Sequence, residues 1–89
     1  MSQTVLADSA SMKKEIMNRC RADMGEHGAA IVKVCVDEEV KAVNALSSYP
    51  SKYNKIISRC MNEMREHGFM IVKVCTDEDI KAEKALSRY

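Results

Sequence analysis

The fold is decided by the stretch IVKVCV at residues 31–36, which returns as IVKVCT at residues 71–76. β-branched residues are dense in both stretches, and such residues favour strands. In a strand, alternation places Val32 and Val34 on one face and Lys33 on the other, so the lysine face is the more exposed one. We therefore expect a short strand over each of these two stretches.

A helix is expected on each side of the strand. Before it, Ile16 and Cys20 recur at helical spacing after a suitable N-cap at Ser11. Gly28 suits the end of that helix because glycine tolerates a positive φ. After the strand, Asp37 suits the N-cap of a second helix. The same signals recur forty positions later, so each unit reads as helix–strand–helix.

The chain is a tandem repeat. Residues 11–49 and 51–89 align without a gap, and 21 of the 39 positions are identical. Neither copy is large enough to hold a core alone, so we expect a single domain after a flexible segment over residues 1–10. Two copies are few for an open stack of repeats, and unpaired strands leave backbone groups unsatisfied. We therefore predict an α+β fold in which a two-stranded antiparallel ribbon is covered by four helices about a pseudo-twofold axis.

Two alternatives to this arrangement remain open in the sequence. Cys35, Glu38, Ala42 and Leu46 have helical spacing, so residues 29–49 could form one long helix. The ribbon could also form between the two chains of a homodimer. The β-branched residues and the Asp-Glu pair that follows them favour the strand.

Composition and charge narrow the class of protein. The net charge is +1, from 14 basic and 13 acidic residues, which is not typical of a protein held to nucleic acid by bulk charge. The apolar runs are too short to span a membrane, and the first residues lack the pattern of a secretory signal. We expect a cytoplasmic protein, whose thiols stay reduced.

The four cysteines fall into two kinds of position. Cys20 and Cys60 lie within the apolar stripe of the first helix of each copy, and we expect them to be buried as small hydrophobes. Cys35 and Cys75 lie on the exposed strand face beside lysines, which can lower a thiol pKa and make the thiol reactive. They could also cross-link to each other if the strand register places them opposite. A half-covered, inert cysteine is the plainer interpretation.

No arrangement of residues predicts catalysis. Cys20 and His27 are separated by ~10 Å along one helix axis, which is beyond hydrogen-bond reach. The spacings of cysteine and histidine match none of the usual zinc patterns, and the sequence has no glycine-rich phosphate loop. We expect a protein that is not an enzyme and that holds no metal and no cofactor.

Residues 32–41 resemble the start of a ribbon-helix-helix protein, in which an alternating strand runs into an acidic N-cap and a helix. The order of a strand over 30–36, a helix over 38–48 and a helix over 51–66 matches that family, and residues 72–81 repeat its first part. The chain departs from the family because it begins with the helix that should come last. A complete fold therefore needs a circularly permuted, fused pair.

This resemblance implies DNA binding. Family members read bases with the outward side chains of the ribbon, where lysine contacts guanine well and cysteine reads little. They hold phosphates at the N-terminus of the last helix, which suits an anion. The residues implied are Lys33, Cys35, Lys73 and Cys75 for the bases, and Ser51, Lys52 and Ser11 for the phosphates.

The differences between the copies point instead to a protein partner. Small or charged residues of the first copy give way in the second to types enriched at interfaces, although Phe69 and Met70 could simply fill the core. We therefore expect a small non-catalytic binding module, a protein-binding inhibitor or adaptor of the kind that phages and mobile elements encode. The alternative is a DNA-binding transcriptional regulator. The expected partner-binding residues are Phe69, Met70, Tyr53 and Arg65, with Lys33, Cys35, Lys73 and Cys75 of the strand face.

Overall fold

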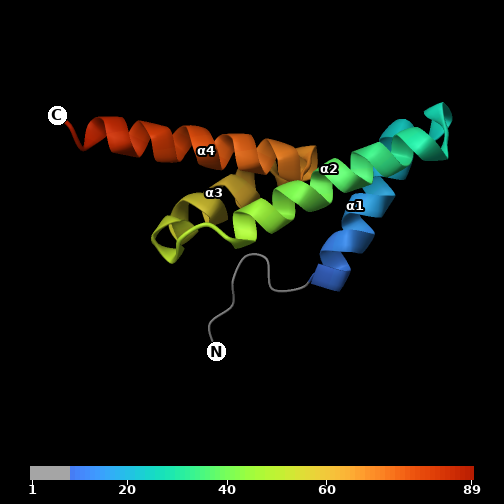
Figure 1. Cartoon of the computed structure of the whole chain (residues 1–89), viewed down its shortest axis with the longest axis horizontal. Helices are drawn as coiled ribbons and strands as arrows, with labels where there is room; N and C mark the ends of the chain where they lie inside the picture. Colours follow the sequence, from blue (N-terminus) through green and yellow to red (C-terminus); the bar gives the residue numbers. More distant parts are fainter. Residues whose placement is uncertain (1–8) are drawn as a thin grey trace.

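The computed structural model describes residues 9–89, which form two helical hairpins (Figure 1). The first hairpin joins α1 (Ser9–Met24) to α2 (Ala29–Ser47), and the second joins α3 (Asn54–Met64) to α4 (Phe69–Leu86). Three short 3-10 helices lie at the turns: η1 (Gly25–His27), η2 (Ser51–Tyr53) and η3 (Arg65–His67). Of the segment over residues 1–10 that the sequence predicts to be flexible, residues 1–8 lie outside the described part.

The predicted strands are wrong. The stretch at residues 31–36 lies inside α2 and its repeat inside α4, and no residue from 9 to 89 is in a strand. Val32 is 5% exposed whereas Val34 is 58% exposed, so the two valines do not share a face as they would in a strand. Cys35, Ala42 and Leu46 continue the buried stripe at helical spacing. Packing of that stripe outweighs the strand preference of the β-branched residues, and the alternative of one long helix is the correct one.

The ribbon-helix-helix resemblance is wrong for the same reason. That fold requires a pair of strands, and the described residues contain only helices and turns. The α+β class and the antiparallel ribbon are therefore replaced by an all-helical fold.

Glycines make the turns of both hairpins. Gly28 has a φ of 96° and Gly68 a φ of 107°, and each ends a 3-10 helix immediately before α2 or α4 begins. A positive φ is unfavourable for other residues, so the expectation for these two glycines is confirmed. The chain reverses there, and the two helices of each repeat pack side by side.

The two repeats stack head to tail, and the pseudo-twofold axis is wrong. α2 and α4 both run from right to left in Figure 1, so the second hairpin is displaced along the direction of the first. In a twofold pair, equivalent residues have equivalent surroundings. Leu46 is 1% exposed, however, whereas its equivalent Leu86 is 62% exposed. The pair is therefore open, and its two ends differ.

One hydrophobic core nevertheless joins the two repeats. Buried residues of all four helices belong to a single cluster, and the molecule measures 49 × 32 × 19 Å. The core residues are Met12, Ile16, Cys20, Val32, Ala42, Leu46, Ile57, Cys60, Met61, Phe69 and Val72.

Candidate functional site at the joint between the repeats

Two disulfides hold the hairpins. Cys20 bonds to Cys35 and Cys60 bonds to Cys75, each with 5.8 Å between the Cα atoms, an ordinary span for a disulfide. The expected burial of Cys20 and Cys60 is confirmed, since both are 0% exposed. The alternatives for Cys35 and Cys75 are wrong. They are not reactive thiols, and they do not cross-link to each other, because each bonds within its own repeat.

The spacing of the cysteines could have revealed these bonds. Both pairs are separated by 15 residues and are centred on the glycine turn. In two antiparallel helices, Cys20 lies eight residues before Gly28 and Cys35 seven residues after it, or about 12 and 10 Å along the axes. The two side chains therefore face each other at one level. The strand interpretation concealed this geometry.

The repeats meet along the second half of α2. Glu39, Ala42 and Leu46 lie there at three- and four-residue spacing, Tyr49 follows just after the helix ends, and we call this set the tail face. At one end Glu39 bonds to the first residue of α4, and at the other Tyr49 bonds to Asp77 two turns along α4. The tail face therefore runs beside the first half of α4, where Ala42 is 4% exposed and Leu46 is 1% exposed.

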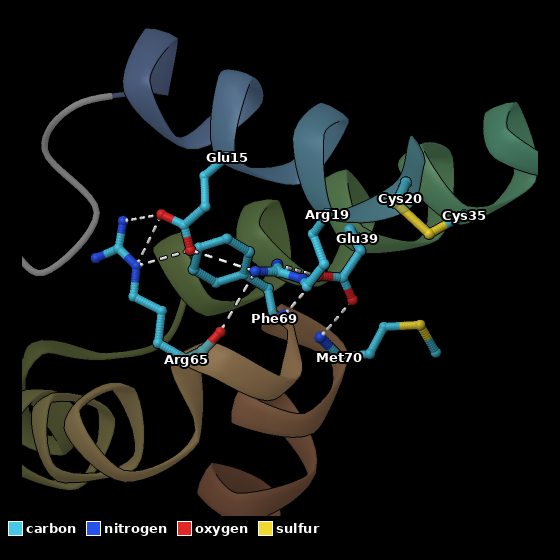
Figure 2. Close-up of polar contacts among 8 residues, drawn as sticks. All are labelled: Glu15, Arg19, Cys20, Cys35, Glu39, Arg65, Phe69 and Met70. Carbon is cyan, nitrogen blue, oxygen red and sulfur yellow. Dashed lines mark hydrogen bonds and ion pairs between the residues drawn. A yellow bond between two sulfur atoms is a disulfide. The ribbon is translucent and has the colours of Figure 1, made fainter. Parts of the chain in front are cut away.

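Glu39 caps α4 from the other repeat (Figure 2). Its Oε1 accepts a hydrogen bond from the backbone N–H of Phe69 at 2.6 Å, and its Oε2 accepts one from Met70 at 3.0 Å. The first amides of a helix lack partners within the helix, and the helix dipole favours a carboxylate there. Arg19 pairs with the same carboxylate at 2.9 Å, so the buried charge of Glu39 is balanced.

Phe69 is the apolar anchor of the joint. Its ring is 0% exposed and lies between two guanidinium groups in Figure 2, with the Cζ atoms of Arg19 and Arg65 at 5.5 and 5.4 Å from the centroid. Arg65 also donates hydrogen bonds to Glu15 of α1, the shortest at 2.6 Å from Nη2. These bonds hold the pKa of Glu15 below its usual value and raise the pKa of Arg65.

Tyr49 closes the other end of the joint. Its hydroxyl donates to Oδ1 of Asp77, and Lys73 donates to Oδ2 of the same carboxylate at 2.8 Å. Burial, followed by the hydrogen bond to Asp77, raises the pKa of Tyr49. Partial burial alone would raise the pKa of Asp77, but the hydrogen bonds from Lys73 and Tyr49 outweigh it, so that this pKa is lowered.

The surface that receives the tail face occurs a second time. On repeat two it is covered, and Ile57 is 2% exposed, whereas the equivalent Met17 on repeat one is 38% exposed. The positions on repeat one line a groove of about 150 Å³. We call the residues that line this groove the receiving face of repeat one: Met17, Arg21, Ala29, Val32, Lys33 and Val36. The receiving face of repeat two is the set of equivalent positions: Ile57, Met61, Phe69, Val72, Lys73 and Thr76.

The tail face also occurs a second time, at the end of α4. Its equivalents are Asp79, Ala82, Leu86 and Tyr89, and every residue from 81 to 89 is exposed. One molecule thus carries one closed joint and both halves of a second joint that is open.

Several residues expected to bind a partner protein instead contact other residues of the same chain. Phe69 and Arg65 lie in the joint, and Cys35 and Cys75 lie in the disulfides described above. Lys33 pairs with Asp37 at 2.6 Å one turn along its own helix, as Lys73 does with Asp77. Met70 is 46% exposed and lines a groove of about 360 Å³ between α2 and α4.

The residues that the resemblance implied for phosphate binding do not lie at equivalent helix N-termini in the two repeats. Ser51 and Lys52 belong to η2, and α3 begins only at Asn54. The Lys52 ammonium lies 5.2 Å from the ring centroid of Tyr53, which is half-buried. Ser11 lies in the first turn of α1.

Sequence reasoning missed the residues of repeat one that form the joint, Glu15, Arg19 and Glu39. A signal was present in the divergence of the copies. Glu15 of repeat one corresponds to Lys55 of repeat two, and its partner Arg65 corresponds to Gly25 of repeat one, so both members of the pair differ between the repeats. In a repeat, two partners that change together mark a contact made in one place only.

Some site types find no candidate in the described part of the chain. Residues 9–89 hold no group of three or more metal-ligating side chains, and no helix among them has the length and apolar character needed to cross a membrane. Comparisons of the chain with protein-family models, curated proteins and solved structures gave no match. The joint between the repeats is therefore the candidate functional site.

Proposed function

We propose that this protein is a non-catalytic protein-binding module built on two disulfide-linked helical hairpins. One observation supports this above all: equivalents of the surfaces at the joint recur as the tail face of α4 and the groove on repeat one, and no other part of residues 9–89 fills that groove. The internal joint is a helix-in-groove contact, which is a common mode of protein recognition, and the recurring surfaces keep part of its side chains.

The composition of the uncovered surfaces supports binding to a protein. Leu86 is 62% exposed and Tyr89 is fully exposed at the end of α4, and Met17 lies half exposed in the groove. Such apolar side chains on a soluble surface mark interaction sites when they gather with a charged rim. Glu83 on α4 and Arg21 at the groove supply opposite charges that would select a partner.

No observation on the described residues favours the nucleic-acid alternative. Lys33 and Lys73, the lysines that the resemblance implied for base contacts, lie on helices and not on a ribbon, and each is paired with an aspartate. The net charge of +1 supplies no general attraction for phosphate. We therefore propose no DNA-binding role.

We also infer that the protein works in an oxidising compartment. Disulfides persist in such compartments and are rare where glutathione keeps thiols reduced. All four cysteines are paired within the repeats, and both bonds span helices of a hairpin. This proposal replaces the cytoplasmic location that the sequence alone suggested.

The proposed function is tested by capture with a matched control. The oxidised chain is immobilised and exposed to an extract of its native host, and each captured protein is purified and titrated against it. We expect Leu86→Asp to abolish binding because it places a charge in the tail face. Val34→Asp changes a residue that is equally exposed, at 58%, but lies outside both faces, and should bind like the wild type. A partner that binds both variants alike, or no purified partner, contradicts the proposal.

A further inference from the structure

We propose that the partner of these surfaces is a second copy of this chain, bound head to tail. The tail face of α4 in one copy would occupy the groove on repeat one of the next copy. This inference rests on the proposed function and specifies the partner. It is argued from the internal joint, because that joint already shows one tail face of this sequence seated on one receiving face of this sequence.

The apolar part of the internal joint can form again between chains. Ala82, Leu86 and Tyr89 are identical to their tail-face equivalents in repeat one, of which Ala42 and Leu46 are buried and Tyr49 is half-buried. Val32 at the floor of the groove is identical to its counterpart Val72, and it is already buried at 5% exposure within the single chain. Leu46 is 1% exposed in the internal joint, whereas its equivalent Leu86 is 62% exposed and would be covered in the same way by a second copy.

The tyrosine contact can also form again. Asp77 holds Lys73 through Oδ2 and Tyr49 through Oδ1. Asp37 holds Lys33 through Oδ2 at 2.6 Å, but no tyrosine of the described residues reaches its other oxygen. Tyr89 of a second copy would donate to that oxygen.

The helix cap has its counterpart too. Arg59 holds Asp79 at 3.0 Å, as Arg19 holds Glu39. Asp79 is thereby kept at the position from which Glu39 caps α4. Among residues 9–89, no side chain accepts a hydrogen bond from the backbone N–H of residues 29 and 30, in contrast to the two bonds that Glu39 accepts at the start of α4. Asp79 of the second copy would cap them, and the helix dipole favours a carboxylate there.

The two copies of the joint differ in charge, and the differences complement each other. Met61 of the covered receiving face is replaced by Arg21, and Val43 of α2, which packs on the core, is replaced by Glu83 on α4. Opposite charges on the two open surfaces attract each other. Ala29 replaces the anchor Phe69, so the joint between chains should be weaker than the internal joint, and association should be reversible.

The positions of the two surfaces favour growth along one direction. In Figure 1 the free half of α4 forms one end of the molecule and the turn of the α1–α2 hairpin lies at the other. A contact between two different faces does not satisfy itself, because each added copy exposes a new tail face. The assembly would continue the stack of repeats from one chain into the next.

The experiment measures sedimentation of the oxidised full chain from about 1 μM to about 1 mM, the range of weak protein interfaces. We expect the average mass to rise with concentration from the 10.0 kDa of one chain to beyond a dimer. Leu86→Asp blocks the tail face and Met17→Glu blocks the groove, and each should weaken association at least about tenfold. Helical circular dichroism checks that both variants remain folded, and Val34→Asp should associate like the wild type.

Mixing the two blocked variants gives the decisive test. One contributes an intact groove and the other an intact tail face, so the mixture should form a 1:1 dimer that grows no further. The variant Arg21→Glu, which reverses the charge at the groove, should weaken association. The double variant that also carries Glu83→Arg should restore it. A wild-type chain that stays at 10.0 kDa, or a mixture that forms no dimer, overturns this inference. If that monomer still binds another protein through Leu86, the proposed function survives; if it binds nothing, both fail.

Discussion

Glu39 and Asp79 occupy the same position in the two repeats but have different surroundings. The Glu39 side chain is 9% exposed against the N-terminus of α4, whereas Asp79 is 40% exposed and paired with Arg59. Removing one partner of a buried, charged hydrogen bond leaves the other partner unsatisfied, which is the costly case. An exposed ion pair is screened by solvent and contributes little.

Substitution of Glu39→Gln should therefore lower the free energy of unfolding by about 1.5–3 kcal/mol, because the amide accepts fewer hydrogen bonds and leaves Arg19 only its longer ion pair with Glu15, at 3.4 Å. Asp79→Asn should leave the free energy of unfolding of the monomer unchanged. Both are measured by urea denaturation at low protein concentration. Equal losses for the two variants would show that Glu39 does not hold the joint.

The two turn glycines provide a second matched pair. Gly28 and Gly68 both have positive φ, so alanine should cost about 1–2 kcal/mol of strain at either. A Cβ at Gly28 meets nothing within 4 Å, whereas a Cβ at Gly68 would lie 3.0 Å from Oε1 of Glu39. Gly68→Ala should therefore destabilise the chain more than Gly28→Ala in the same denaturation assay. The opposite order would mean that Glu39 can move away without loss.

At the scale of the element, each hairpin is a pair of helices closed by a glycine turn and by a disulfide. The bond lies two turns from the glycine on either side and fixes the register of the helices. A disulfide stabilises chiefly by restricting the unfolded chain, and the effect grows with the enclosed loop.

Replacement of Cys20 and Cys35 together by serine should lower the free energy of unfolding by about 3 kcal/mol, as expected for a loop of about 15 residues. The disulfide between Cys60 and Cys75 encloses a loop of equal length. Replacement of both of these cysteines by serine should therefore lower the free energy of unfolding by a similar amount. Thermal denaturation with and without reductant provides the measurement. No change on reduction of the wild type would mean that the bonds are absent or contribute nothing to stability.

At the scale of the whole molecule, the joint between the repeats is held at both ends by titratable groups. Glu15 pairs with Arg65 at one end, and Asp77 accepts from Tyr49 at the other. The pKa values of Glu15 and Asp77 are lowered from 4.5 and 3.8, and that of Tyr49 is raised from 10.0. The joint is therefore sensitive to both acid and alkali.

The direction of each effect follows from linkage. Groups with lowered pKa values contribute stability above their usual values, so the contributions of Glu15 and Asp77 should be lost as the pH falls below 4.5 and then below 3.8. The raised pKa of Tyr49 contributes stability below pH 10.0, which should be lost as the pH rises beyond it. Urea denaturation across this range should show both losses. Tyr49→Phe should reduce the alkaline loss, to which the raised pKa of Lys73 beside Asp77 also contributes, and Tyr89→Phe should not. Identical profiles for the two variants would contradict this assignment.

The candidate site could be predicted only in part. Phe69 and Arg65 differ from their repeat equivalents, and the sequence therefore predicts a contact for them, but with a separate partner protein and not with the other repeat. Their actual partners, Arg19 and Glu15, each lie 50 residues away, and no local pattern connects such positions. Burial of Cys20 followed from its place in an apolar stripe, whereas its bond to Cys35 required the correct element on both sides of the turn.

The sequence by itself determined the repeat, the two glycine turns and the apolar stripe of the first helix, because those features depend on identity and local spacing. Only the tertiary structure decided that residues 31–36 are helical, since the β-branched preference is small and is overcome by a long buried face. Only the tertiary structure also decided that, of two equivalent residues, Leu46 is buried and Leu86 is exposed. Two nearly identical units can close about a twofold axis or stack in one direction, and the choice depends on contacts between surfaces that are distant in the chain.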